Sequence, residues 1–399
     1  MDELWAELVL VSGDGVLLGK LPPVLVERPW WQDAGAVVRA VRKAHGVDVT
    51  VLRLLRAQRE GPPGGAVTYL AEAAEPLDCQ PCEETLADHP LRCGYARPGG
   101  PRRDLAWAAS ALAARGLQLA GAPEQIKTWN LSSLWRLPLN PAQPGPGSAW
   151  LKVVPKFFAH EGALIAALAD HGPVPRVLGF ERGRVLLAEI PGEDGFHAPL
   201  EQRRQMIDLL VQLVTACRAR LPELLALGLP DFRAQPLSAA IESSFERYCS
   251  ELDPEDARRL SLFLDQLDAR WRQLTDCGLP DGLVHGDFHS GNVRVADQQL
   301  ALIDWGDAGI GHPLLDQAAF LERVPPEQRQ PLREHFCAAW QRAVPGSDPA
   351  RAAQLIAPIA AARQTVIYDR FLDQIEPSEH PYHRRDPLRW LARAAQVLR

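Results

Sequence analysis

Residues 285–292 are His285-Gly286-Asp287-Phe288-His289-Ser290-Gly291-Asn292, and residues 303–307 are Ile303-Asp304-Trp305-Gly306-Asp307. Short apolar runs around these segments predict strands, and a turn at residues 297–299 would return Asp304 to the side of Asn292. A carboxylate and an amide carbonyl are oxygen ligands that Mg²⁺ accepts beside waters and phosphates. Asp287 then remains as the acceptor of a hydroxyl proton, so this part of the chain indicates phosphoryl transfer.

Each of these residues also fits an ordinary loop when it is taken alone, because Asp, and Asn after Gly, are common turn formers. The ordered set of His285, Asp287, Asn292 and a strand-borne Asp304 favours the functional interpretation. The segment from Leu283 to Asp316 resembles the catalytic and metal-binding loops of the aminoglycoside phosphotransferase and choline kinase-like superfamily, which is similar in fold to protein kinases.

The resemblance implies a role for each residue of the motif. Asp287 would be the catalytic base, Asn292 and Asp304 would be ligands of Mg²⁺, and structural roles would fall to His285, Asp307 and Asp316. Protein kinases carry His-Arg-Asp and Asp-Phe-Gly, and Ala-Pro-Glu after them. This chain has His-Gly-Asp and Asp-Trp-Gly, and no Ala-Pro-Glu follows, which favours a small molecule over a protein as the acceptor.

A kinase also needs a cation on the nucleotide phosphates, and only five of the 43 basic residues are Lys. Lys152 lies in the apolar stretch at residues 149–154, where a charge is costly unless it meets a partner. Glu161 begins a helical apolar pattern nine residues later, so a strand Lys and a helix Glu would form the kinase phosphate site. Lys156 is a weaker candidate because Pro155 ends the strand, and an exposed edge-strand Lys152 is the alternative.

Two further segments concern the nucleotide. Residues 126–131 and 133–137 predict a hairpin of the kind that covers the nucleotide in the superfamily, where Ser132 and Ser133 would offer N–H groups to phosphate. A plain hairpin turn fits this segment equally well. The strand at residues 185–190 resembles the kinase hinge, whose backbone at Glu189 and Ile190 would line the base pocket. The superfamily includes users of ATP and of GTP, and both stay open.

Composition limits the partners and the location. A net charge of −7 and a pI near 5.9 argue against nucleic acid and anionic membranes as partners. No apolar stretch is long enough to cross a bilayer, and the N-terminus lacks the pattern of a signal peptide, so we expect a cytoplasmic protein.

Seven Cys suit a reducing compartment. Cys79, Cys82 and Cys93 could form a zinc cluster, but their spacing is not that of two ligand pairs. Cysteines that occur in a loop by chance are the favoured interpretation. The oligomeric state stays open.

The predicted organisation has three parts. Residues 1–121 would form an extra α/β domain, with a strand at 8–18, a helix at 34–44, strands near 49–55 and 66–71, and a helix at 105–115. Residues 122–190 would form a kinase-like small lobe and residues 191–399 a helical large lobe, including an apolar helical stripe at 206–217. The fold class is therefore a two-lobed, protein-kinase-like α+β fold preceded by an α/β domain.

The extra domain carries a second resemblance. Residues 39–47 resemble a Nudix box in which every Glu has been replaced, so a degenerate Nudix-like domain would lack the acids that hold metal on a diphosphate. An ordinary amphipathic helix capped at Gly46 is the alternative.

The predicted function is Mg²⁺-dependent transfer of the γ-phosphoryl group of ATP or GTP to a hydroxyl of a small molecule. The rival hypotheses are a catalytically silent nucleotide-binding regulatory module and a nucleotide hydrolase in the first domain. Asp369, Asp373 and Glu376 are predicted to share one helix face, and the resemblance implies that such acids line the acceptor pocket, which favours an amine-bearing sugar or aminoglycoside. A solvated helix face, partly neutralised by Arg363 and Arg370, is the alternative.

Overall fold

The computed structural model describes residues 2–73, 79–142, 146–296 and 299–398. The chain forms two compact units. Unit 1 consists of Met1–Gly162, Val177–Glu189 and Arg370–Arg385, and unit 2 consists of Ala163–Arg176, Ile190–Asp369 and Asp386–Arg399. The chain thus passes from unit 1 to unit 2 three times, after Gly162, after Glu189 and after Arg385. The domain boundaries expected after residues 121 and 190 remain a prediction.

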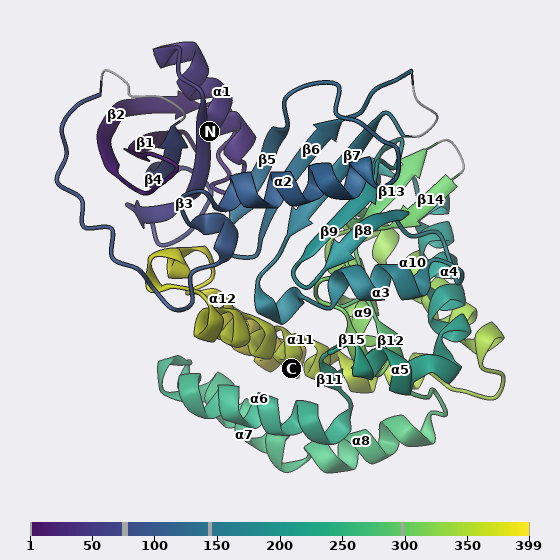
Figure 1. The fold of residues 1–399 in the computed structure, drawn as a ribbon. Helices are drawn as coiled ribbons and strands as arrows, with labels where there is room; N and C mark the ends of the chain where they lie inside the picture. Colours follow the sequence, from purple (N-terminus) through teal and green to yellow (C-terminus); the bar gives the residue numbers. More distant parts are fainter. Residues whose placement is uncertain (1, 74–78, 143–145, 297–298, 399) are drawn as a thin grey trace. The chain divides into compact units, whose positions relative to one another are not determined.

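The first sheet of unit 1 has four strands in the order β2-β1-β4-β3, and helix α1 packs against it (Figure 1). Leu4, Ala6, Leu8 and Leu10 of β1 point into the core that this sheet shares with α1, and Val9 and Val11 point to the other face, where they join a second buried cluster. Strands β1 and β4 are parallel, and the other pairs are antiparallel. The elements are β1 (Leu4–Val11), β2 (Leu17–Val26), α1 (Ala34–His45), β3 (Val49–Ala57) and β4 (Gly65–Ala73).

The structure corrects one element here and confirms the others. The single strand predicted at residues 8–18 is the end of β1, a turn and the start of β2, because Gly15, with φ +86°, turns the chain. Helix α1 ends as predicted at Gly46, whose left-handed backbone lets its N–H donate to the carbonyl of Arg42. A capped amphipathic helix is present, and the Nudix-like character of the domain stays a prediction.

The second sheet of unit 1 is antiparallel, with five strands in the order β5-β6-β7-β9-β8. Helix α2 (Gly100–Ala113) crosses one face of it and shares its core through Ala108 and Leu112 (Figure 1). The predicted hairpin and the strand that carries Lys152 are confirmed, and β8 was not predicted. The strands are β5 (Glu124–Trp129), β6 (Ser132–Pro138), β7 (Ser148–Val153), β8 (Val177–Glu181) and β9 (Arg184–Ala188).

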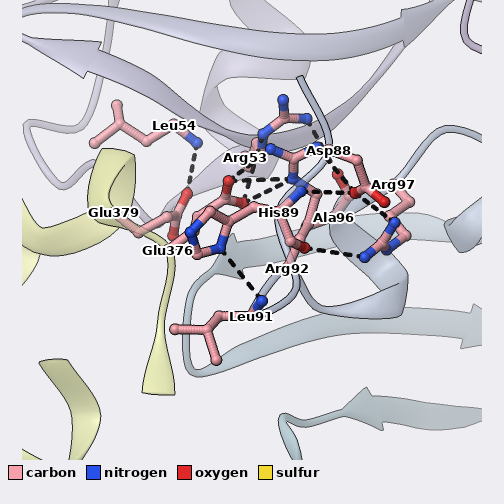
Figure 2. A network of polar contacts seen from close by, with 10 residues as sticks. All are labelled: Arg53, Leu54, Asp88, His89, Leu91, Arg92, Ala96, Arg97, Glu376 and Glu379. Atoms are coloured by element: carbon pink, nitrogen blue, oxygen red, sulfur yellow. Dashed lines mark hydrogen bonds and ion pairs between the residues drawn. The ribbon is translucent and has the colours of Figure 1, made fainter. Parts of the chain in front are cut away.

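The C-terminal part of unit 1 covers the edge strand β3. The carboxylate of Glu379, in the 3-10 helix η7 (Pro377–Tyr382), accepts a hydrogen bond of 2.8 Å from the N–H of Leu54 (Figure 2). Gln125 accepts from the N–H of Val51 at 2.9 Å and donates to its carbonyl at 2.7 Å. Side chains therefore replace a further strand at this edge and satisfy backbone groups that would otherwise be open to pairing.

Arg53, Glu376 and Glu379 are buried around this edge, and Arg92, with its side chain 10% exposed, lies beside them (Figure 2). Arg92 holds Glu376 with both Nε and Nη2, at 3.0 and 2.7 Å, and Arg53 lies 3.6 Å from the same carboxylate. Burial raises the pKa of Glu379, the Leu54 N–H, Arg53 and Arg92 oppose the rise, and the nearby Glu376 adds to it, so that the pKa is about 8. Glu379 therefore keeps its proton to a higher pH in the folded protein than an ordinary glutamate does.

We expect Glu379→Gln to remove part of the pH dependence of stability. The folded-state pKa of Glu379 lies above its ordinary value of 4.5, so its contribution is full below that pH and is lost as the pH rises through about 8. The loss is at most about 1.4 kcal/mol per pH unit. Gln keeps a carbonyl acceptor for the Leu54 N–H and cannot ionise. Urea unfolding between about pH 5 and pH 9 should show a falling free energy of unfolding for the wild type and a flatter curve for the variant.

The exposed Glu83 is a matched control, and Glu83→Gln should follow the wild-type curve. Parallel pH curves for the wild type and Glu379→Gln would show that the proton on Glu379 does not matter for stability.

Unit 2 is mostly helical and holds two small sheets. The sheets have the orders β10-β13-β14 and β11-β15-β12, formed by β10 (Glu193–Asp194), β11 (Asp231–Phe232), β12 (Gly282–Val284), β13 (Val293–Ala296), β14 (Gln299–Leu302) and β15 (Gly309–Gly311). The predicted strands around the motif are thereby confirmed, although the tip of their turn, residues 297–298, lies outside the described residues.

The helices of unit 2 include the predicted stripe at residues 206–217, which faces the core from α4. Helix α3 (Glu161–Leu168) begins in unit 1, and the last residues of α11 belong to unit 1. The others are α4 (Leu200–Ala216), α5 (Leu221–Ala226), α6 (Ala234–Tyr248), α7 (Pro254–Asp265), α8 (Leu267–Asp276), α9 (Leu315–Glu322), α10 (Pro326–Ala343), α11 (Pro349–Gln374) and α12 (Asp386–Val397). Among the described helices, none is both long and apolar enough to span a bilayer. The predicted α+β class is confirmed.

Candidate active site

The loop that carries Asp287 begins with a tight turn at Gly286. Its φ of +90° is a left-handed conformation, and a Cβ built there would lie 2.0 Å from the carbonyl oxygen of Asp307. Any larger residue would collide with that backbone, so glycine is required. The turn directs the chain out of β12 and places Asp287 at the start of the loop that leads to Asn292.

Asp316, at the start of α9, fixes the backbone on both sides of this turn. Its two carboxylate oxygens accept hydrogen bonds of 2.8 Å each from the N–H groups of His285 and Gly286. Burial raises the pKa of Asp316, and these hydrogen bonds and the neighbouring His285 and Arg363 oppose the rise. Arg363 is wholly buried over the ring of Phe232, at 4.2 Å, and donates to the carbonyl of Gly286 at 3.3 Å. The turn is thus held by an acid and a base from two helices.

His285 ties the loop to the strand that precedes Asp304. Its Nε2 lies 3.0 Å from the carbonyl oxygen of Ile303, which can only accept, so Nε2 carries the proton. Burial lowers the pKa of His285 and keeps the ring neutral. Phe288 anchors the next turn of the loop by stacking on Phe320, with ring centroids 4.8 Å apart. The first residues of the loop therefore have little freedom.

The carboxylate of Asp287 is held by three neighbours. Arg323 donates to Oδ1 at 2.7 Å, Asn292 donates to Oδ2 at 3.1 Å, and Nε2 of His289 lies 3.4 Å from Oδ2. Burial raises the pKa of Asp287, but the hydrogen bond from His289 and the charge of Arg323 together hold it well below its usual range. Asp287 is therefore an ionised carboxylate with a hydrogen-bond donor on each oxygen.

His289 and Arg323 were missed in the sequence. His289 lies inside the motif, and its Nδ1 accepts a hydrogen bond of 3.0 Å from the N–H of Gly291, so its proton is on Nε2 and points to Asp287. Phe196 packs on this ring, with centroids 5.6 Å apart. His289 could have been predicted to contact Asp287, because it lies only two residues after it in the motif. Nothing in the sequence indicates that Arg323 contacts Asp287.

Asn292 and Asp304 are the residues whose chemistry fits a magnesium ion. The amide nitrogen of Asn292 donates to the carbonyl of Asp287 at 2.9 Å as well as to its carboxylate, so the carbonyl oxygen is the atom that Asn292 can offer a metal. Asp304 has φ +64°, and no other non-glycine residue of the described chain has a positive φ. A strained residue of this kind costs roughly 1–3 kcal/mol and is usually kept for function. Hard oxygen ligands from one amide and one carboxylate suit Mg²⁺.

Lys152 and Glu161 form an ion pair inside unit 1. Nζ of Lys152, on β7, lies 2.7 Å from Oε1 of Glu161, the first residue of α3, and the two side chains are 15% and 2% exposed. Gly162 follows, and a Cβ there would lie 2.9 Å from Cβ of Phe180, so glycine is the residue that fits at this position. Strand β7 ends at Val153, and Lys156 lies beyond it. The predicted strand-to-helix pairing is present.

The other residues that were predicted to bind the nucleotide lie in unit 1 or directly after its segment that ends at Glu189. The hydroxyl of Ser132 accepts from Nε1 of Trp129 at 3.2 Å, and the buried hydroxyl of Ser133 accepts from Nε1 of Trp135 at 3.0 Å. The N–H of Glu189 donates to the carbonyl of Ser148 at 3.1 Å, and Ile190 is the first residue of unit 2 after it. The serine hydroxyls thus have internal partners, and the backbones of Ser132 and Ser133 pair with neighbouring strands of the sheet. Their role in binding phosphate stays a prediction.

Of the three acids predicted to share one helix face, Asp369 and Asp373 lie in the helix and Glu376 does not. Helix α11 ends at Gln374, before Pro377, so Glu376 lies outside it and the predicted helix to Glu376 is wrong at its end. The carboxylate of Glu376 is held by Arg92. Asp369 accepts from Ser244 and Tyr248 at 2.9 Å each, and from Arg247. Asp373 follows Asp369 by one turn of α11. Their role in acceptor binding stays a prediction.

The cysteine cluster shows no metal site. Cys79 lies 3.1 Å from the carbonyl oxygen of Leu18, and burial raises the pKa of Cys93 to about 11. Within the described ranges, no group of three or more His, Cys, Asp or Glu side chains could hold a metal ion.

Comparison with known proteins assigns the family. Residues 145–355, more than half of the chain, match the model of the phosphotransferase enzyme family, APH. The chain belongs to this family, as the resemblance of residues 283–316 implied. No curated protein matches the chain. The match begins after the first sheet of unit 1, so the Nudix-like interpretation of that domain is not supported by it.

One solved structure shows the fold, and two others are similar to the chain at lower scores. A choline/ethanolamine kinase family protein from Mesorhizobium loti is 16% identical, with 73% of this chain and 94% of that chain covered and a TM-score of 0.50. A macrolide 2'-phosphotransferase from Brachybacterium faecium is 19% identical, with 70% and 97% covered and a TM-score of 0.48. A choline kinase from Cryptosporidium parvum is 12% identical, with 69% and 87% covered and a TM-score of 0.49. The family match and the likeness to the Mesorhizobium loti protein together show a kinase-like α+β fold.

Proposed function

We propose that this protein transfers the γ-phosphoryl group of ATP or GTP to a hydroxyl of a small molecule, with Mg²⁺. The observation that carries the proposal is the hydrogen-bonded unit of Asp287 and Asn292, followed along the chain by the strained Asp304. Asp287 accepts the hydroxyl proton and orients the attacking oxygen. Asn292 and Asp304 hold the metal, which when bound neutralises charge on the transferred phosphoryl group.

Lys152 has the role of binding the nucleotide phosphates, and Glu161 fixes its position through their ion pair. Backbone groups at Ser132 and Ser133 approach the phosphates, and backbone groups at Glu189 and Ile190 bind the base. A catalytically silent regulatory module is the alternative. The ion pair and the ordered Asp287 loop support the enzyme instead, since a silent module has no need of a fixed proton acceptor.

The test is incubation of the whole chain with γ-labelled ATP or GTP, Mg²⁺ and a panel of amino sugars, aminoglycosides and neutral sugars. Addition of one phosphoryl group to one acceptor, detected by mass, supports the proposal. Nucleotide binding without transfer to any acceptor or to water would favour the regulatory module.

We also propose an amine-bearing acceptor, on the basis of Asp369 and Asp373 one turn apart on α11. Replacing both with Asn should raise the KM for an amine acceptor about tenfold and leave the KM for nucleotide unchanged, because lost charge pairs weaken ground-state binding. The contacts of Asp369 to Ser244 and Tyr248 make unfolding a competing explanation. Thermal unfolding of the double variant and of the exposed control Asp265→Asn separates the two effects.

A neutral sugar as the best acceptor, or an unchanged KM in a folded double variant, would show that these acids do not bind an amine.

A further inference from the structure

Helix α9 holds the Asp287 loop from both of its ends. Asp316, in its first turn, accepts from the backbone of His285 and Gly286, and Arg323, its C-terminal cap residue, donates to the side chain of Asp287. The two residues are seven positions apart, so they lie on the same face of the helix. One short, rigid element therefore sets both the path of the loop and the direction of its carboxylate.

The hydrogen bonds of Asp287 leave one direction for an incoming hydroxyl. An ionised carboxylate offers about four lone-pair positions, two on each oxygen. Oδ2 has two neighbouring donors, Asn292 and His289, at 3.1 and 3.4 Å, which account for its two positions. On Oδ1, Arg323 takes one, at 2.7 Å. The remaining position is on Oδ1, directly beside the guanidinium group of Arg323.

Arg323 suits a positioning role. Its side chain is 42% exposed and that of Asp287 is 31% exposed, so their contact is open to solvent on one side. It makes a single bond to Asp287, through Nη1, and not a two-pronged one. If that bond were lost, the carboxylate would be held from Oδ2 alone and would turn about its Cβ–Cγ bond.

We infer that Arg323 is a positioning residue of the reaction, which holds Asp287 so that Oδ1 receives the acceptor hydroxyl. The inference rests on the proposed function. Arg323 acts through Asp287 and contributes to the turnover number more than to nucleotide binding. A misplacement of about 1 Å in a reacting group can cost on the order of 100-fold in rate.

The test measures phosphate release from ATP or GTP with Mg²⁺ in the whole chain, with water as the acceptor, and transfer to an acceptor once one is found. For Arg323→Gln we expect kcat to fall by about 10- to 100-fold, with the KM for nucleotide within about twofold of wild type. Arg323→Lys should recover most of the loss, since an ammonium can replace a single hydrogen bond. Arg329→Gln, an exposed arginine whose bond goes to the carbonyl of Glu322, is the matched control and should retain wild-type kcat.

A second arm separates positioning through Asp287 from a general structural effect. In an Asp287→Ala background, Arg323→Gln should lower kcat no further, because the group that it positions is gone. Equal losses in both backgrounds, or wild-type kcat in a folded Arg323→Gln, would overturn the inference while the proposed function stands. A wild-type protein that releases and transfers no phosphoryl group would instead overturn the proposed function.

Discussion

Asp287→Asn is expected to lower the turnover number by about 10²- to 10⁴-fold, the usual contribution of a proton acceptor, and to leave nucleotide affinity nearly unchanged. Asn has the same shape as Asp, so the loop should keep its path, which is held by Asp316 through the backbone of Gly286. It lacks the negative charge that now faces Arg323 and Asn292, and one of its two positions becomes a donor. The group that accepts the hydroxyl proton is removed while Lys152 is untouched.

The measurement is single-turnover phosphoryl transfer, together with nucleotide binding by calorimetry. Asp304→Ala is the contrasting variant, because it removes a charged metal ligand and should weaken binding of the magnesium nucleotide before it affects chemistry. Wild-type turnover in Asp287→Asn, or an unaltered magnesium dependence in Asp304→Ala, would show that the motif has been assigned to the wrong residues.

The motif at residues 285–304 was predictable because its constraints are local. Strands, a glycine turn and a hairpin bring Asp287, Asn292 and the end of β14 together within some twenty residues of chain. The pairing of Lys152 with Glu161 was predictable for a similar reason. Lys152 lies in an apolar strand, and Glu161 begins the helical apolar pattern nine residues later, so a short connection brings the two side chains together. The sequence thus identifies the reacting groups where short-range structure assembles them.

Arg323 was not predictable, because its partner is 36 positions away and arginine is the common cation of this chain. The contact of Glu379 with Leu54 spans 325 positions and depends on packing of the C-terminal segment on an edge strand. No periodicity in either segment indicates such a contact. Long-range hydrogen bonds of single side chains are decided by tertiary structure and not by propensity.

The prediction that Glu376 shares a helix face with Asp369 and Asp373 was wrong, and the reason was visible in the sequence. Glu376 directly precedes Pro377, and a residue before proline is disfavoured in a helix, so α11 ends before Glu376. Periodicity alone extended the helix by two residues and joined Glu376 to Asp369 and Asp373. In the structure the carboxylate of Glu376 forms an ion pair with Arg92.

Lys152→Met is expected to lower kcat/KM for nucleotide by about 100-fold and also to destabilise the protein. The activity falls because a positive charge on the phosphates is lost. The stability falls because Glu161, only 2% exposed, loses the cation 2.7 Å from its carboxylate. Removing one partner of a buried ion pair commonly costs about 3–5 kcal/mol. Steady-state kinetics and urea unfolding measure the two effects, and the exposed Lys127→Met in the same sheet is the control.

The double variant Lys152→Met, Glu161→Gln separates activity from stability. Gln carries no charge to be left in the protein interior, so the double variant should regain most of the lost free energy of unfolding. It should regain none of the activity, because no cation is restored for the phosphates. Recovery of both quantities would mean that Lys152 only neutralises Glu161, and that the phosphates are bound by other groups. Recovery of stability alone assigns Lys152 to the nucleotide and leaves Glu161 as the residue that positions it.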